Sequence, residues 1–167
     1  NGSDAIAAAL KTALLATGRP GVLAFEGGYH GLMYGPLALC GYSATFREPF
    51  RAQLNPHVRF TPYPRGAREL ASACDAITDE VGAVVLEPAL GRGGNLFPAA
   101  GALASIAERC RARGALLIVD EIFTGLGRTG ARWANDEATP DLLCIGKALG
   151  GGMPISACIG RGEVMRA

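Results

Sequence analysis

The segment "ALLIVDE" at residues 115–121 decides the class of fold that we expect for this chain. Five consecutive apolar residues precede two carboxylates, and they show no alternation of apolar and polar positions. A continuous apolar run of this length predicts a β-strand buried on both faces, as in a parallel sheet. Four further segments repeat the form: "GVLAFEGG" (21–28), "GAVVLEP" (82–88), "DLLCIG" (141–146) and "ISACIG" (155–160).

A helix is predicted before the first of these strands, over residues 4–17. Ser3 is expected to be its N-cap, Asp4 favours the positive end of the helix dipole, and Gly18 follows as the residue that ends the helix. The alanine- and leucine-rich composition between these signals is typical of a helix.

Further helices are predicted over residues 66–79 and 99–113, the second ended by Gly114. Strands that alternate with helices predict right-handed crossovers and a mainly parallel sheet. The expected fold class is therefore α/β, with three layers (αβα) around that sheet. Residues 40–65 are rich in Pro, Arg and aromatic residues without a clear period, and are expected to form a long connection with one short helix.

Composition excludes several classes of function. The chain has 167 residues, 49% of them hydrophobic, and a net charge of +1, which gives no basic field for nucleic acid. No apolar run is long enough for a membrane span, and no secretory signal opens the chain. The five cysteines are widely spaced without a CxxC pair, which indicates reduced thiols in a soluble, cytoplasmic protein and neither a disulfide nor a metal site.

Both ends of the chain resemble interior sequence. It begins on a helix-capping signal without an initiator Met, and it stops at "RGEVMRA" where another helix is expected to start. We therefore expect residues 1–167 to be part of a longer protein.

Chemically active side chains follow directly after the predicted strands. In open α/β sheets, ligands bind beyond the carboxyl ends of the strands, so these residues are expected to converge. The set comprises Tyr29, His30, Glu87, Gly91, Asp120, Glu121 and Lys147.

Together with the start of the first helix, this set describes a pocket for pyridoxal phosphate. Only two of the 16 Lys and Arg side chains are lysines, and Lys147 can lose its proton and form an imine, which an arginine cannot. A carboxylate such as Asp120 can keep a pyridine nitrogen protonated, and Tyr29 can stack on a flat ring. Gly2 and Ser3, at a helix N-terminus, can hold a phosphate.

Each of these residues also has a plainer interpretation. Lys147 could be a surface lysine, Asp120 and Glu121 could be a metal-binding or general-base pair, and Ser3 could be only a helix cap. His30 could orient a loop through its ring nitrogens, and Glu87 could satisfy N–H groups of a turn. The runs "GRGG" and "GGG" do not form the GxGxxG pattern of a dinucleotide loop.

Five segments, in this order, resemble the class III (omega-type) aminotransferases, which are fold-type I pyridoxal phosphate enzymes. They are "NGSDAIAAALKTALLATGR", "FEGGYHG", "VVLEPALGRGG", "LIVDEIFTGLGRTG" and "CIGKALGGGMP". The resemblance runs from residue 1 to about residue 160 and implies a partial cofactor-binding large domain. It also implies that an N-terminal segment and a C-terminal small domain complete the protein.

The resemblance implies a role for each matching residue. Lys147 would form the Schiff base with pyridoxal 5′-phosphate and move the proton, and Asp120 would pair with the pyridine nitrogen. Tyr29 and Ile122 would cover the two ring faces. Cofactor contacts are further expected from Gly2 and Ser3 at the phosphate, and from His30 and Glu87.

Two positions depart from many ornithine, acetylornithine and 4-aminobutyrate members of the family. Those members have Gln at the position of Phe123, where it bonds the phenolic oxygen of the cofactor. They often have Glu at the position of Arg92, where it can mask a substrate-binding arginine. Neither scheme fits the residues of this chain.

The expected function is transfer of an amino group from an amine or ω-amino acid donor to a 2-oxo acid acceptor, in a homodimer when the protein is complete. One alternative is an isomerase similar to glutamate-1-semialdehyde aminomutase, which returns the amino group to the same carbon skeleton. A second is a non-catalytic module that retains the fold. Residues 1–167 alone are expected to be inactive, since part of the cofactor pocket lies outside them.

Overall fold

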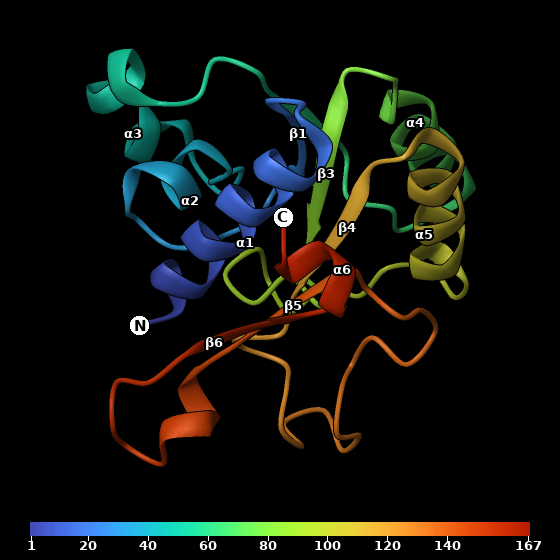
Figure 1. Ribbon diagram of the computed structural model, residues 1–167. Coiled ribbons are helices and arrows are strands. Elements are labelled where there is room, and N and C mark those ends of the chain that lie inside the picture. Colours follow the sequence, from blue (N-terminus) through green and yellow to red (C-terminus); the bar gives the residue numbers. More distant parts are fainter.

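A single six-stranded sheet forms the centre of the molecule in the computed structural model, which describes all residues 1–167 (Figure 1). The strands are β1 (Gly21–Phe25), β2 (Val58–Thr61), β3 (Val81–Leu86), β4 (Leu116–Asp120), β5 (Leu142–Ile145) and β6 (Ala157–Gly160). Their spatial order is β2-β1-β3-β4-β5-β6. The first five are parallel, and β6 runs antiparallel to β5. The predicted mainly parallel sheet is confirmed.

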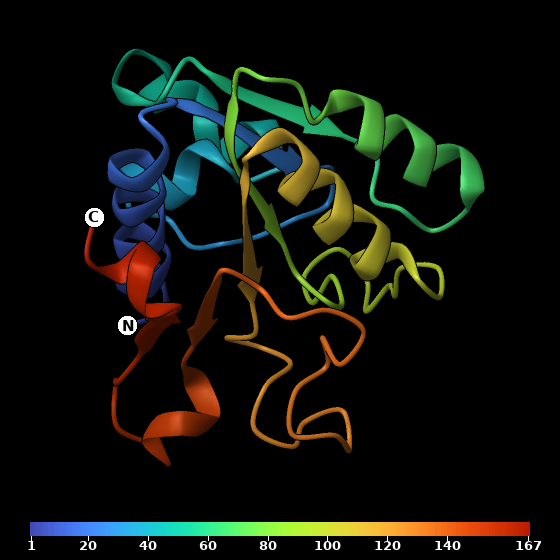
Figure 2. The same ribbon diagram turned by 45° about the vertical axis from the view of Figure 1, so that its right-hand side comes forward.

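Helices cover both faces of this sheet. In Figure 1, α1 lies on one side of β3 and β4, while α4 and α5 lie on the other, and the turned view of Figure 2 keeps this separation. The helices are α1 (Gly2–Thr17), α2 (Tyr34–Ala38), α3 (Ala44–Arg47), α4 (Ala67–Ala76), α5 (Ala102–Arg113) and α6 (Gly162–Met165), with 3₁₀ turns η1 (Glu48–Gln53) and η2 (Lys147–Gly150). The expected three-layer αβα architecture is therefore present.

The sheet divides the core into two clusters, one on each face. Successive residues of a strand contribute alternately to one cluster and to the other. Leu117 and Val119 of β4 pack with α4 and α5, whereas Ile118 between them packs with α1. All three are fully or almost fully buried. Burial on both faces explains why this segment reads as an unbroken apolar run, since neither face of the strand meets water.

The first helix begins earlier than the sequence predicts. Asn1, rather than Ser3, is the N-cap: its side chain accepts a hydrogen bond from the backbone N–H of Ser3, and Asp4 completes a capping box. The prediction for Ser3 was wrong because Asn and Ser are equally good caps, and local sequence does not decide between two such positions so close together. Gly18 ends the helix in the left-handed conformation (φ 67°), as expected.

Two strands differ from expectation, and both lie at edges of the sheet. Residues 40–65 were expected to hold one short helix, but they contain α3, η1 and the edge strand β2. In β2, Arg59 is exposed and Val58 and Phe60 are half-buried, so the apolar pattern of a buried strand is missing. The segment 155–160 was expected to be buried on both faces, but it forms the edge strand β6, in which Ile159 is 48% exposed.

All five cysteines are free. Cys40, Cys110 and Cys144 are buried, while Cys74 and Cys158 are partly exposed. Burial raises the pKa of Cys110 to about 12, which keeps this thiol protonated and unreactive near neutral pH. No helix of the molecule combines the length and apolarity that a membrane crossing requires.

Candidate active site

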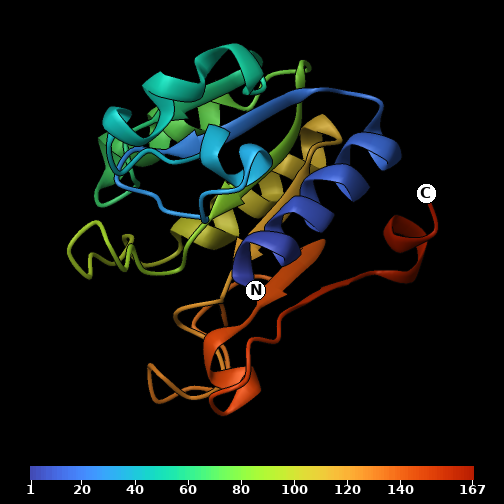
Figure 3. The same ribbon diagram turned by 90° about the vertical axis from the view of Figure 1, so that its left-hand side faces the viewer.

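One cavity of about 460 Å³ lies at the carboxyl ends of the parallel strands, beside the start of α1. Figure 3 shows α1 crossing the sheet with its first turn at this end, near the loops that follow the strands. Eight residues that the sequence singles out line the cavity together: Gly2, Ser3, Tyr29, His30, Glu87, Asp120, Ile122 and Lys147. Segments up to 145 residues apart in the sequence thus converge, as the strand-end rule predicts.

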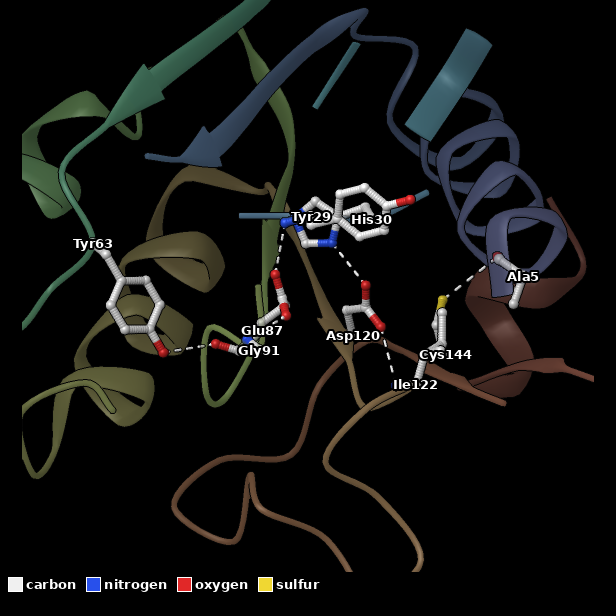
Figure 4. Close-up of polar contacts among 9 residues, drawn as sticks. All are labelled: Ala5, Tyr29, His30, Tyr63, Glu87, Gly91, Asp120, Ile122 and Cys144. Carbon is white, nitrogen blue, oxygen red and sulfur yellow. Dashed lines mark hydrogen bonds and ion pairs between the residues drawn. The ribbon is translucent and has the colours of Figure 1, made fainter. Parts of the chain in front are cut away.

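Asp120 and His30 form a buried pair at the floor of the cavity. The Nδ1 atom of His30 lies 2.7 Å from Oδ2 of Asp120, and both side chains are at most 4% exposed (Figure 4). The other carboxylate oxygen accepts the backbone N–H of Ile122 at 3.0 Å. Because a carboxylate has about four acceptor sites, Asp120 keeps acceptor capacity for a donor in the cavity.

These carboxylates favour the protonated form of His30. Burial alone lowers the pKa of His30, but the hydrogen bond and charge of Asp120, with the charge of Glu87, outweigh it and raise the pKa above the ordinary value of 6.5. The interpretation of His30 as a residue that only orients a loop is therefore too narrow: its ring fixes the orientation of the Asp120 carboxylate.

Glu87 ties together the loops that follow β1 and β3. Its Oε1 accepts the backbone N–H of Tyr29 at 2.7 Å, and its Oε2 accepts that of Gly91 at 3.2 Å (Figure 4). The hydroxyl of Tyr63 donates to the Glu87 backbone carbonyl at 2.8 Å. Burial raises the pKa of the Glu87 carboxyl. This contact pattern matches the structural interpretation of Glu87, which also borders the cavity.

Glu121 belongs to a different environment from its neighbour Asp120. Its carboxylate accepts hydrogen bonds from the Thr124 hydroxyl and from the Asn135 N–H at 2.9 Å, and it is 1% exposed. Successive residues at the end of a strand point to opposite sides, so the two carboxylates do not act as a pair. Glu121 anchors the loop of residues 121–135 and does not line the cavity.

Ile122 packs between the first helix and the loop after β5. A Cβ atom at Gly2 would lie 2.9 Å from Cγ2 of Ile122, and one at Gly146 would lie 3.4 Å from the same atom. These approaches hold the start of α1 and the segment before Lys147 against one apolar side chain. The wall that Ile122 forms is therefore fixed by two backbone segments.

The start of α1 provides backbone N–H groups at the cavity. Gly31 has φ 109°, and a Cβ atom there would collide with the Ser3 hydroxyl, so only glycine allows the loop after His30 to pass this close. The Asn1 side chain occupies the N–H of Ser3 at 2.9 Å. An anion at this helix start would replace the Asn1 amide oxygen as the acceptor.

Lys147 extends from the first position of η2, two residues after β5 ends. Its backbone has φ 42°, a left-handed conformation that non-glycine residues rarely adopt and that is enriched at functional sites. The side chain is exposed, with Nζ 5.5 Å from the centroid of the Phe123 ring. Lys147 is thus an amine at the mouth of the cavity with no carboxylate partner.

Four residues that line the cavity were not among the site residues expected from the sequence: Asn1, Gly31, Arg92 and Phe123. Arg92 and Phe123 were noted only as departures from the family. Gly31 follows Tyr29 and His30 directly and carried a signal, because a glycine next to a functional residue often marks a close backbone approach. Asn1 was missed because Ser3 also carries a capping signal.

The cavity of this α/β domain lies at the strand ends and is bordered by a lysine amine, a helix N-terminus and a carboxylate that a histidine orients. This arrangement is expected of a pyridoxal phosphate enzyme. The model of the family "Aminotransferase class-III" matches residues 1–167, so the chain belongs to this family.

Known relatives agree with this assignment. The chain is similar to an acetylornithine aminotransferase of Methanopyrus kandleri, with 39% identity over 169 residues that cover 100% of this chain and 42% of the relative. Its structure is similar to that of adenosylmethionine-8-amino-7-oxononanoate aminotransferase from Methanocaldococcus jannaschii, with a TM-score of 0.89 and 27% identity over 99% of this chain and 41% of that chain. The chain thus spans about two fifths of the length of these relatives.

Proposed function

We propose that the complete protein is a pyridoxal 5′-phosphate-dependent aminotransferase, in which residues 1–167 form part of the cofactor-binding domain. The observation that carries the proposal is the convergence of Lys147 and the Asp120–His30 pair on one cavity. Membership of the class III family supports it, since enzymes of this family use this cofactor. The proposed substrates are an amino donor with an ω-amino group and a 2-oxo acid acceptor.

The residues present fit the cofactor. The cavity of about 460 Å³ has an acid at its floor, an aromatic ring and an aliphatic side chain at its walls, and a helix N-terminus at one end. Asp120 has spare acceptor capacity for a protonated ring nitrogen, and Tyr29 and Ile122 offer faces for a flat ring. The glycine at position 31 leaves the Ser3 hydroxyl room to face a phosphate.

Pyridoxal 5′-phosphate, when bound, supplies an electron-withdrawing ring that acidifies the C–H bond beside the transferred nitrogen. Lys147 would be the residue that holds the cofactor through its Nζ amine. The same Nζ, when free, would act as the base and acid that moves a proton at the substrate carbon beside the transferred nitrogen. Asp120 would hold a positive charge on the ring nitrogen, and His30, at 2.7 Å, keeps the carboxylate aligned.

Two broader features of the complete protein belong to the same proposal. We infer a homodimer, supported by exposed apolar side chains such as Leu15 (69%) and Met153 (72%), which an interface would cover. Sedimentation of the complete protein tests this. We also infer a cytoplasmic location, which the five free thiols support.

An amino-transfer assay with a separate 2-oxo acid tests the proposed function. The complete protein, loaded with cofactor, is expected to consume the donor and to convert the oxo acid into an amino acid in equal amounts. Amino-group movement within one substrate, without any need for an oxo acid, would instead identify an aminomutase. Absence of the absorbance band that a lysine–cofactor imine gives would indicate a non-catalytic module.

A further inference from the structure

Arg92 lies at the mouth of the cavity in a turn that is fixed to the cavity floor. The turn is closed by paired backbone hydrogen bonds between Leu90 and Leu96, at 2.9 and 3.3 Å. The preceding residue, Gly91, donates its N–H to Glu87 and packs against the Phe123 ring, where a Cβ atom would lie only 2.8 Å from Cδ1. The backbone of Arg92 is therefore held in place by its neighbours.

The guanidinium of Arg92 stacks on an aromatic ring and has no anionic partner. Its Cζ lies 4.4 Å from the centroid of the Tyr29 ring. Among all described residues it forms no ion pair, whereas Arg59, Arg113 and Arg161 each pair with a carboxylate. Stacking of this kind orients the plane of the guanidinium and leaves its N–H edge free to donate.

The carboxylates that share the cavity are hydrogen-bonded to other parts of the chain and not to Arg92. Both oxygens of Glu87 accept backbone N–H groups, and both oxygens of Asp120 accept His30 and Ile122. The cavity thus has acids at its floor that are bonded within the chain, and at its rim the Arg92 guanidinium, which forms no ion pair. A cation in this position attracts an anion that comes from outside the chain.

We propose that Arg92 binds a carboxylate of the substrate, and that Arg92 and Phe123 together select straight-chain ω-amino acids over plain alkylamines. The inference rests on the proposed function and adds a specificity determinant to it. A guanidinium with a free edge pairs with a carboxylate through two parallel hydrogen bonds. The Phe123 ring beside it offers no hydrogen-bond partner, so it forms an apolar wall for the methylene groups between the two ends of such a substrate.

The first experiment compares two donors of equal chain length, 5-aminopentanoate and pentylamine, in the cofactor-loaded complete protein. Arg92→Gln is expected to raise KM for 5-aminopentanoate about 10- to 100-fold, the range of a lost charged hydrogen bond, and to change KM for pentylamine less than about 2-fold. Arg92→Lys should fall between the two, because a lysine keeps the charge and loses the planar fork.

Arg128→Gln is the matched control. Arg128 is also exposed and lies near the same ring, with Cζ 5.4 Å from the Phe123 centroid, but it does not line the cavity. Removal of this charge is expected to leave the preference between the two donors unchanged. Equal losses in both arginine variants would mean that only the general positive potential matters, and would overturn the proposal for Arg92.

A second measurement does not depend on turnover. Glutarate, a dicarboxylate without an amine, is titrated into the cofactor-loaded protein by calorimetry. The proposal predicts that Arg92→Gln weakens glutarate binding at least about 10-fold and that Arg128→Gln leaves it unchanged. Unchanged binding in Arg92→Gln would overturn it. If no donor is consumed by the unmodified protein, the proposed function fails, while this titration still decides whether Arg92 holds a carboxylate.

Discussion

The two halves of the candidate site differ in how the chain supports them. At the floor, Asp120, His30 and Glu87 are at most 5% exposed. Asp120 and His30 contact each other at 2.7 Å, and Glu87 accepts two backbone N–H groups, at 2.7 and 3.2 Å. At the mouth, Lys147 lies in the exposed segment of residues 147–155, and the only side-chain hydrogen bond nearby runs from the Ser156 hydroxyl to the Asn1 carbonyl, at 2.6 Å.

This difference indicates that the floor and the mouth of the site have different functions. The acidic floor is organised by residues of this chain alone, so its charges are in place before any ligand arrives, which is the arrangement that electrostatic stabilisation requires. The segment around Lys147 combines a strained backbone with high exposure, so its amine has freedom to move between partners. The floor should therefore control stability as well as activity, and the mouth should control activity alone.

Lys147→Ala is expected to give the largest effect. In the complete protein it should lower kcat for amino transfer on the order of 10⁴-fold or more, because the residue that holds and deprotonates the reacting groups is lost. The midpoint of thermal unfolding should change little, since the side chain is exposed. Lys11→Ala, the other lysine, is the control and should retain full activity; equal losses would remove Lys147 from its assigned role.

Asp120→Asn should lower kcat by about 10²- to 10³-fold, the size of a lost preorganised electrostatic contact. Unlike Lys147→Ala, it should also lower the free energy of unfolding, because a neutral amide is a weaker partner than a carboxylate for Nδ1 of His30, 2.7 Å away. Steady-state kinetics combined with chemical unfolding measures both. Near-normal turnover in this variant would contradict the role of Asp120 at the ring nitrogen.

His30→Gln tests the stability of the floor through its pH dependence. Loss of the buried partner of Asp120 should cost about 3–5 kcal/mol of unfolding free energy. Because the pKa of folded His30 is raised above 6.5, the stabilisation is complete below pH 6.5 and is lost as the pH rises through the folded pKa. The gap between wild type and variant should therefore shrink with rising pH.

Urea unfolding over a range of pH values measures this gap. His57→Gln, at the one other histidine, serves as the control because His57 is exposed. A gap that widens above pH 6.5 would show that His30 is buried in its neutral form.

Two glycines with nearly equal φ angles allow a comparison of smaller effects. Gly31 (φ 109°) would place a Cβ atom against the Ser3 hydroxyl, whereas Gly152 (φ 111°) has no atom within 4 Å of such a Cβ. Gly152→Ala should cost about 1 kcal/mol from backbone strain alone. Gly31→Ala should cost roughly 1–3 kcal/mol more, from overpacking. Equal losses in thermal stability would mean that the packing at Ser3 relaxes freely.

The sequence predicts the floor of the site better than its surroundings, for a physical reason. Asp120 ends an apolar run that reads as a buried strand, and parallel strands bring their carboxyl ends to one edge, so its place in the site follows from pattern alone. That His30 would be the partner of Asp120 does not follow, because the contact joins residues 90 positions apart. Side-chain partners depend on packing that no local pattern encodes.

The edges of the fold were the least predictable part. Strand β2 is short and half exposed, so its residues lack the apolar run that marks β3 and β4. The N-cap at Asn1 was missed because Asn and Ser two residues apart are equally suitable caps. In both cases the local signal is weak, and tertiary contacts decide the outcome.

Reductive trapping tests the central claim, that Lys147 and the acidic floor together form a pyridoxal phosphate site. The complete protein is loaded with the cofactor, reduced with borohydride, digested and mapped by mass spectrometry. We predict that the pyridoxyl label lies on Lys147, and that Asp120→Asn shifts the absorbance of the bound cofactor before reduction. A label on Lys11, or no label on any lysine, would contradict the account.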